Sequence, residues 1–280
     1  MDFIPEPREV VANIAASFIA TAIVAIIAIV VFVTRKKAAF LKSICKDHKK
    51  NWTLFRTFEF RLASIADTLD TLQKLSNEES LASIRCDDRR FHLTKLLNNA
   101  DNPSHVFRTL LLELDKLEAE ASLLIESIEL ISKKTQLNNS IWAVRSLEEA
   151  AQNLEISAYE CLSGYRLHAR VLYTATNQFL SGGNQDEAVK HNFGNYAAYF
   201  CGAPVRYHTP MDDGQPLPTV FEHLKKLEET LMTYWSKVKE FSGRFPKRSL
   251  GNNFEPSIEG RKLWPDFEKN MNAFYKLEKP

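Results

Sequence analysis

The residues best able to carry out chemistry lie together in one stretch of the chain that is rich in aromatic residues, glycine and proline. They are two imidazoles, a thiol and two carboxylates, contributed by His191, Cys201, His208, Asp212 and Asp213. Metal sites and activated thiols are built from these residue types. Their spacings of ten, seven and four residues match no known ligand pattern, so a folded connector with ordinary polar residues is the preferred interpretation. An enzyme that uses the 185–217 segment is the third-ranked alternative.

The rest of the sequence contains no recognisable catalytic or cofactor motif. There is no P-loop, GxGxxG, GxSxG, HExxH or EF-hand pattern, and no Glu-x-x-His pair of the kind found in di-metal bundles. The four cysteines are widely spaced and form no CxxC pair, which argues against a disulfide framework and against structural zinc. We therefore expect no catalytic residue, no bound metal and no cofactor.

An uncharged apolar run lies near the N-terminus, from about Val10 to Val33. As a helix that rises about 1.5 Å per residue it spans roughly 36 Å, which is enough to cross a hydrocarbon core of about 30 Å. The run is too long for the apolar region of a signal peptide, and the segment before it, 1–9, is net negative and not basic. We predict that 10–33 is a retained transmembrane helix and that 1–9 is a short extracytoplasmic segment.

Positive charges follow this run. Seven Lys or Arg residues lie between Arg35 and Lys50, against the single acid Asp47. By the positive-inside rule, the N-terminus lies outside the cell membrane, while the basic juxtamembrane segment 34–54 and the body lie in the cytoplasm. Cations at this position also attract anionic lipid. The expected headgroup contacts are Arg35, Lys36, Lys37 and Lys42.

Within the apolar run, small and weakly polar residues recur every four positions. They are Asn13, Ser17, Thr21 and Ala25. This spacing places them on one helix face, where two helices can approach closely and form hydrogen bonds in lipid. We take these four residues as candidate contacts between two anchor helices.

Heptad-spaced apolar residues dominate the 55–180 segment and predict a helical bundle with coiled-coil-like seams. The first stripe runs from Phe55 to Leu72, on a helix that starts inside the membrane or just after it. A shorter helix is expected at about 78–99.

Two long helices follow. The first runs from Ser104 to about Lys134, and the second reaches about Leu180 after a polar turn near 136–139. Because the turn is so short, the two helices must fold back on each other as an antiparallel αα-hairpin built on their heptad seams.

The 181–218 segment is predicted to be an irregular, aromatic-rich connector with a short helix at about 185–200. Its aromatic side chains argue against disorder, because they bury a large apolar area when packed. The candidate partner surface consists of Phe193, Tyr196, Tyr199, Phe200 and Tyr207. The remaining segment, 219–280, is predicted to form C-terminal helices that pack on the bundle, the first of them ending near Ser242.

Composition agrees with helix and argues against a nucleic-acid partner. Only nine glycines occur, and the formal net charge at pH 7 is +1, so no strong positive field is available for nucleic acid. We therefore predict an all-α protein with a single N-terminal transmembrane helix and a soluble body of long antiparallel helices.

An anchor followed by helical hairpins resembles, in architecture only, membrane-tethered adaptor and scaffold proteins of bacteria, which implies the bacterial inner membrane. The leading hypothesis is a membrane-anchored interaction or adaptor protein that recruits or senses a partner at the cytoplasmic membrane face. The alternative is an oligomerising membrane effector, of toxin or defence type, triggered through its cytoplasmic body. The expected partners are the lipid bilayer and either another protein or a second copy of the chain.

Overall fold

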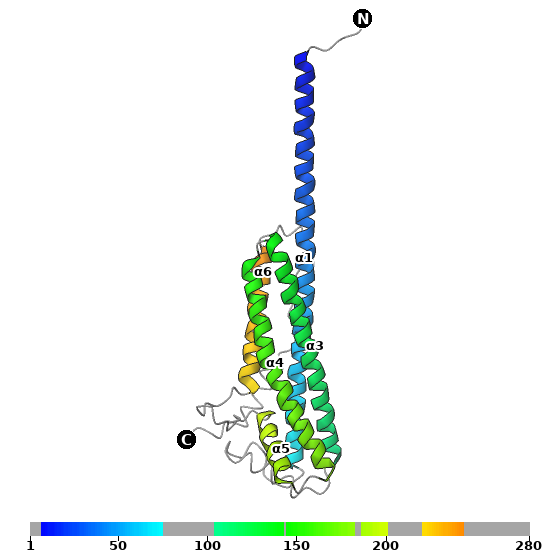
Figure 1. Ribbon diagram of the computed structural model, residues 1–280, viewed down its shortest axis with the longest axis vertical. Coiled ribbons are helices and arrows are strands. Elements are labelled where there is room, and N and C mark those ends of the chain that lie inside the picture. The colour runs from blue at the N-terminus through cyan, green and yellow to red at the C-terminus, as the bar shows by residue number, and fades with distance from the viewer. Residues whose placement is uncertain (1–6, 75–103, 143, 183–185, 201–219, 244–280) are drawn as a thin grey trace, which may run out of the picture.

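The computed structural model describes residues 7–74, 104–142, 144–182, 186–200 and 220–243. These residues form five helices and contain no strand, as Figure 1 shows. The helices are α1 (Pro7–Lys74), α3 (Ser104–Trp142), α4 (Arg145–Leu180), α5 (Glu187–Phe200) and α6 (Val220–Gly243). The predicted all-α fold is confirmed. The helices predicted at 78–99 and within 244–280 lie outside the described residues.

The first helix, α1, is one uninterrupted element that contains both the apolar run and the first heptad stripe. It begins at Pro7, whose fixed φ suits a first helical turn, and no glycine or proline follows before its end at Lys74. At about 1.5 Å per residue, this helix of 68 residues is roughly 100 Å long. The apolar end and the body are therefore joined by continuous helix, with no linker between them.

Helices α1, α3, α4 and α6 lie side by side and alternate in direction, which makes an up-down-up-down four-helix bundle (Figure 1). The short helix α5 packs on α4 at the end of the bundle away from the projecting part of α1. Every residue of the predicted α1 stripe from Phe55 to Leu72 is buried, as are the predicted stripes of α3 and α4. The antiparallel αα-hairpin is thus present as α3 and α4.

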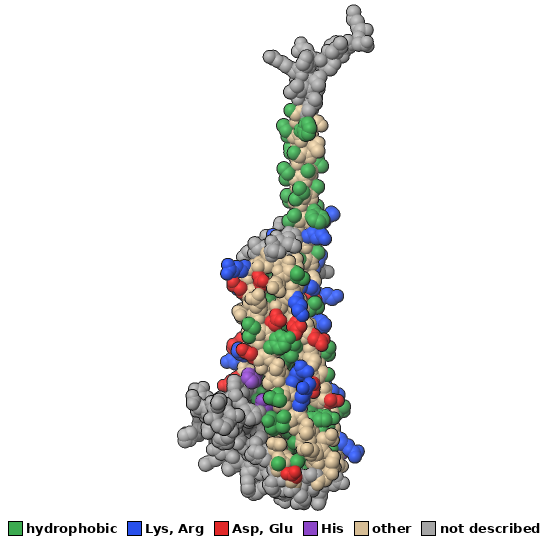
Figure 2. Space-filling view, in the orientation of Figure 1, with side chains coloured by type: hydrophobic (Ala, Val, Ile, Leu, Met, Phe, Trp, Pro, Cys, Tyr) green, Lys and Arg blue, Asp and Glu red, His purple; other side chains and the backbone are tan. Residues whose placement is uncertain are grey.

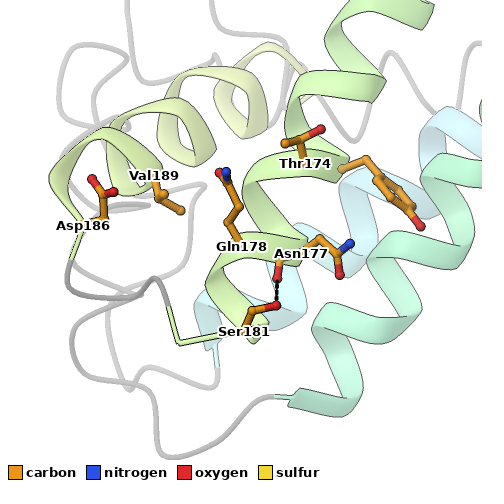
Figure 3. A pocket seen from close by; sticks show the side chains of 7 residues that line it. Thr174, Asn177, Gln178, Ser181, Asp186 and Val189 are labelled. Carbon is orange, nitrogen blue, oxygen red and sulfur yellow. Dashed lines mark hydrogen bonds between the residues drawn. The ribbon is translucent and has the colours of Figure 1, made fainter.

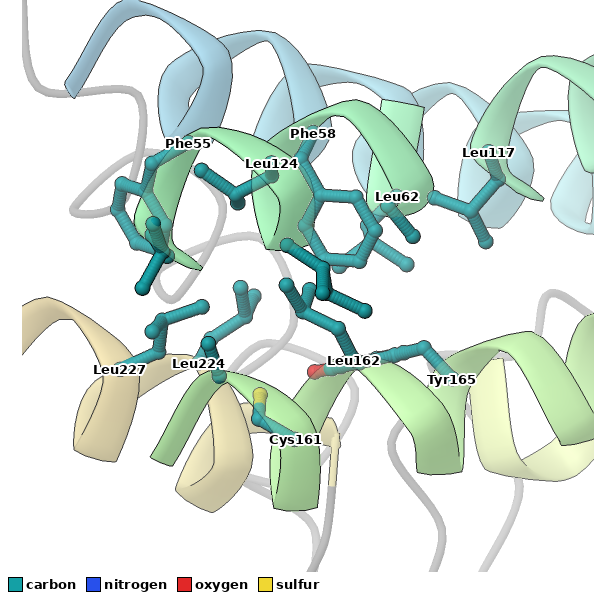
Figure 4. Close-up of a cluster of buried hydrophobic side chains, with 14 of the residues drawn as sticks. Phe55, Phe58, Leu62, Leu117, Leu124, Cys161, Leu162, Tyr165, Leu224 and Leu227 are labelled. Carbon is teal, nitrogen blue, oxygen red and sulfur yellow. The ribbon is translucent and has the colours of Figure 1, made fainter. Parts of the chain in front are cut away.

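The core of the bundle is built from large apolar side chains on all four long helices, which point toward one another in Figure 4. The residues labelled there are Phe55, Phe58 and Leu62 of α1, Leu117 and Leu124 of α3, Cys161, Leu162 and Tyr165 of α4, and Leu224 and Leu227 of α6. Each of these side chains is at most 1 % exposed. Burial of apolar area on this scale is the main favourable contribution to folding.

The predicted position of the hairpin turn, near 136–139, is wrong. Helix α3 continues to Trp142, and α4 begins at Arg145. The polar residues that suggested a turn are satisfied on the helix surface: Asn138 donates to the carbonyl of Lys134 at 2.8 Å, and Asn139 donates to the Glu148 carboxylate. Since asparagine in a helix costs only a few tenths of a kcal/mol, two satisfied asparagines do not end it.

The helix predicted at about 185–200 is confirmed as α5. The chain leaves α4 at Gly182, whose φ of +97° is in the left-handed region that glycine adopts without strain. The Asp186 carboxylate then accepts a hydrogen bond from the Ala188 backbone N–H at 2.8 Å. This bond caps the N-terminus of α5 and fixes where the helix starts.

Candidate functional site

The apolar part of α1 projects beyond the bundle (Figure 1), and none of its most apolar stretch is buried. Its Ile, Val and Phe side chains from Phe18 to Val33 are between 37 % and 74 % exposed. By length and composition this helix can cross a membrane, and an N-terminal signal sequence has the same properties. A core helix of a soluble protein is mostly buried, and this stretch is not.

The predicted contacts between anchor helices lie on this projecting part. Ser17, Thr21 and Ala25 are exposed, and only the helical backbone of Asn13 is described. The Thr21 hydroxyl donates to the Ser17 carbonyl at 2.8 Å. That bond satisfies the hydroxyl proton within the helix, so Thr21 offers another helix an acceptor and a small surface. Association of two anchors stays a prediction.

The four predicted headgroup cations surround α1 where it enters the bundle, and we call them the basic collar: Arg35, Lys36, Lys37 and Lys42. Phe40 is buried against the ring of Phe241, with 6.2 Å between centroids, so the bundle starts about 10 Å beyond Val33 along the helix. That distance is close to the thickness of one headgroup layer, about 5–8 Å. Arg35, Lys36 and Lys37 therefore lie between the apolar helix and the bundle, and Lys42 lies in the first turn of the bundle. Figure 2 shows Lys and Arg side chains in blue where the projecting helix meets the bundle.

The aromatic residues predicted as a partner surface are mostly interior. Phe193, Tyr199 and Phe200 are at most 2 % exposed, Tyr196 is half-buried, and Tyr207 lies outside the described residues. Phe193 packs edge-on against Phe107, with 5.8 Å between ring centroids. These side chains hold α5 on the bundle in this conformation, because burying a large ring removes much apolar area from water. Contact between this segment and a partner stays a prediction.

The described residues bring one group of reactive side chain types together, where α4, α5 and α6 meet. His168 stacks on Tyr199 with 3.8 Å between ring centroids, and the Tyr199 hydroxyl lies 3.4 Å from Nδ1 of His223. The Cys161 thiol donates to the His223 carbonyl at 3.2 Å, and Tyr165 contacts the rings of both Tyr199 and His223. Tyr165 and His168 of α4 are thus part of a packed aromatic cluster.

The protonation states in this cluster argue against a nucleophilic cysteine. Burial raises the pKa of the Cys161 thiol and lowers the pKa values of His168 and His223. The thiol is therefore protonated and both imidazoles are neutral near pH 7, which leaves no thiolate to act as a nucleophile. Among the described residues, no three His, Cys, Asp or Glu side chains are placed to hold a metal ion. Of the residues proposed for an enzyme, Cys201 and His208 lie outside the described part of the chain.

A hollow of about 390 Å³ lies between the end of α4 and the start of α5 (Figure 3). Its lining includes Thr174, Asn177, Gln178, Ser181 and Asp186. Three of these groups are already engaged: Thr174 donates to the Arg170 carbonyl at 2.9 Å, Ser181 donates to the Asn177 carbonyl at 2.8 Å, and Asp186 caps α5. The hollow offers amides, hydroxyls and the Asp186 carboxylate, which can form hydrogen bonds to a small polar molecule.

Sequence reasoning missed a set of exposed apolar side chains on α3 and α4. We call it the leucine stripe, and it consists of Leu112, Leu123, Leu130 and Leu137 of α3 with Ile156 and Leu167 of α4. Each of these side chains is at least 50 % exposed. The sequence contains a signal for these side chains, because Leu123, Leu130 and Leu137 are spaced by seven residues and lie outside the predicted heptad seam of this helix. Figure 2 shows hydrophobic side chains among charged ones on the bundle surface.

The fold and these sites define a helical bundle that carries one long, apolar, exposed N-terminal helix. The chain matches no protein-family model, and no curated protein or solved structure shows detectable similarity to it.

Proposed function

We propose that this protein is a membrane-anchored interaction protein, whose helical bundle recruits or senses a protein partner at the cytoplasmic face of a membrane. The observation that carries the proposal is the structure of α1. The N-terminal part of this helix exposes an uncharged apolar surface from Phe18 to Val33, and its C-terminal part is a core element of the bundle. Lipid is the environment in which such an exposed apolar helix is stable.

The charges next to the apolar run support the orientation. The four cations of the basic collar lie on the bundle side of the run, and the segment before the run is net negative. The positive-inside rule then places the bundle in the cytoplasm. Because the bundle starts about 10 Å beyond Val33, it lies directly on the membrane surface in this arrangement.

The leucine stripe supports a protein partner. Large apolar side chains that are exposed among charged ones occur at protein–protein contact sites. The stripe also has a helical period, and the Tyr159 hydroxyl bridges α3 and α4 beside it by donating to the Glu129 carboxylate. A surface of this kind fits an amphipathic helix of a partner, whose apolar ridge would pack along the leucines.

Photo-crosslinking of the full-length protein in native membranes tests the proposal. A photoreactive amino acid at Leu130 probes the leucine stripe, and the same amino acid at the exposed Lys239 of α6 is the matched control. We expect one partner protein in stoichiometric amount at position 130 and none at position 239. The substitution Leu130→Ser is expected to abolish co-purification of that partner while the circular dichroism spectrum of the bundle is unchanged.

Self-crosslinks alone, concentrated near Ser17 and Thr21, contradict the adaptor proposal and favour the oligomerising effector. In that case expression of the protein is toxic, and the double substitution Ser17→Leu and Thr21→Leu relieves the toxicity by removing the close approach of two anchors. Release of the protein from membranes by alkaline carbonate contradicts both functions, because both require a spanning helix.

A further inference from the structure

A hollow of about 450 Å³ lies along α1 at the point where the apolar helix meets the bundle. Its lining residues recur at helical spacing and therefore share one side of the helix. They are Val30, Val31, Thr34, Arg35, Ala38, Ala39 and Lys42.

The chemistry of this hollow changes along the helix axis. Val30 and Val31 make its outer end apolar, and Arg35 and Lys42 supply two exposed positive charges nearer the bundle. From Val30 to Lys42 the helix rises about 18 Å. This sequence of an apolar part followed by a cationic part matches a phospholipid, whose acyl chains end at a glycerol and an anionic phosphate.

The side chains between the two ends allow a bound molecule to approach the helix. Ala38 and Ala39 have only a methyl group, so the hollow is open at the height of the two cations. The Thr34 hydroxyl donates its proton to the Val30 carbonyl at 2.7 Å, which leaves the hydroxyl oxygen as an acceptor. The planar guanidinium of Arg35 can bind two phosphate oxygens at once, and the Lys42 ammonium adds a second charge.

The basic collar is therefore divided into two pairs. Arg35 and Lys42 line the hollow, whereas the ammonium of Lys36 lies over the ring of Phe32, 5.5 Å from its centroid. Lys36 and Lys37 are not among the residues that line the hollow. A general attraction of basic residues to an anionic surface depends on charge alone and does not distinguish these pairs, but a shaped site does.

We propose that this hollow binds one anionic phospholipid, with its phosphate between Arg35 and Lys42 and its upper acyl chain against Val30 and Val31. The site deepens the proposed function, on which it rests, because it requires α1 to cross a membrane. A lipid held there would fill the gap between bilayer and bundle and fix the height of the bundle on the membrane surface.

Lipid titration of the full-length protein tests this site. The protein is purified in dodecyl maltoside and titrated with phosphatidylglycerol, and native mass spectrometry counts the bound lipids. The double variant Arg35→Gln, Lys42→Gln is compared with Lys36→Gln, Lys37→Gln, which loses the same charge from the same stretch of α1. We expect the Arg35→Gln, Lys42→Gln variant to bind its first lipid with about 30-fold lower affinity, which is the effect of two interfacial cations. The control variant should change this affinity less than about threefold.

A second variant tests the shape of the site while every charge is kept. Ala38→Leu with Ala39→Leu places larger side chains in the hollow. We expect the affinity for the first bound lipid to fall at least tenfold. Phosphatidylcholine is expected to bind more weakly than phosphatidylglycerol, and 10 mM inorganic phosphate is expected to leave the lipid bound. Displacement by inorganic phosphate would overturn the lipid assignment in favour of a simple anion site.

The proposal would be overturned if the two glutamine variants lost equal affinity for the first lipid and the leucine variant lost none. Only general attraction to an anionic surface would then remain. Alkaline carbonate extraction separates this failure from failure of the anchor. Variants that stay in the membrane but bind lipid like the wild type contradict the lipid site alone. Release of the wild-type protein contradicts the anchor itself.

Discussion

Two interfaces within the same bundle are built on different principles. Between α3 and α4 the contact is an apolar seam in which Leu124, Leu154 and their stripe neighbours are fully buried. Ionic groups stay at its edge, where Arg170 donates to Glu118. Such an interface gains its stability from apolar burial.

Between α1 and α6 the contact combines aromatic rings, such as those of Phe40 and Phe241, with buried polar groups of α1. His48 and Asn51 are at most 1 % exposed. The ring nitrogens of His48, both polar atoms of the Asn51 amide and the indole nitrogen of Trp52 have no hydrogen-bond partner among the described residues. His48 stacks on Trp235 with ring centroids 4.8 Å apart.

A buried ion pair also joins α1 to α6. The Arg56 guanidinium donates to the Glu228 carboxylate at 3.0 Å and forms a pair with Glu59, whose side chain is fully buried. It also lies over the ring of Trp52, 4.6 Å from the ring centroid. Desolvating these groups costs free energy that apolar groups do not require, so we expect α6 to be the helix most easily displaced from the bundle.

Removing the central cation of the contact between α1 and α6 should have the largest effect. Arg56→Met leaves the fully buried Glu59 carboxylate without its guanidinium partner, which we expect to cost about 4 kcal/mol of unfolding free energy. Urea unfolding of the full-length protein in detergent, followed by circular dichroism, measures it. The matched control is Arg145→Met, whose pair with Glu149 is exposed and should contribute less than about 0.5 kcal/mol. Equal effects of the two substitutions would contradict a buried, coupled pair.

Creating a cavity in the apolar seam should have the next largest effect. Leu154→Ala removes a fully buried side chain, and we expect a loss of about 3 kcal/mol in the same unfolding assay. Leu123→Ala removes the same atoms from a side chain that is 52 % exposed, and its effect should stay within about 0.5 kcal/mol. A loss below about 1 kcal/mol for Leu154→Ala would show that the seam is not closely packed.

Acid should weaken the contact between α1 and α6 through His48. Burial lowers the pKa of His48 from 6.5 to about 4, so the folded protein keeps this imidazole neutral. Its contribution to stability is complete above pH 6.5 and is lost as the pH falls toward 4, because the unfolded chain then binds a proton that the folded chain rejects. Between roughly pH 7.5 and pH 5 we expect a loss of about 2 kcal/mol.

The variant His48→Phe isolates this titration, because a phenyl ring can keep the stack on Trp235 and carries no proton. His168 and His223 also have pKa values lowered by burial, and their contribution is the same in both proteins. The difference between the two pH profiles of unfolding free energy therefore reports His48 alone. Parallel profiles would mean that the His48 ring is hydrated in the folded protein.

Replacing the unpaired amide should have the smallest effect, and in the opposite direction. Asn51→Leu has similar branching and removes two buried polar groups that lack partners, so we expect a gain of about 1 kcal/mol. The exposed Asn153 of α4 provides the control, since Asn153→Leu has no buried polar group to remove. A loss of stability in Asn51→Leu would show that a bound water or another group satisfies the amide.

The sequence predicts features that depend on helical period alone, and it misses features that depend on contacts between particular side chains. The stripe on α1 from Phe55 to Leu72 was predicted because it depends on helical period alone, and every member is buried. The turn near 136–139 was misplaced because its polar residues form hydrogen bonds within α3 and with Glu148. The four cations of the basic collar were identified from sequence, but the sequence did not separate Arg35 and Lys42 from Lys36 and Lys37.

The sequence by itself determined the long helices, the exposed apolar run and the charge that follows it. These are properties of neighbouring residues, and the absence of glycine and proline between 8 and 74 makes α1 continuous in any environment that supports helix. Only the tertiary structure decided which faces are buried. Phe193 and Tyr199 became core while Leu123 and Leu130 stayed exposed, because burial depends on which distant helix lies opposite, and no local pattern contains that information.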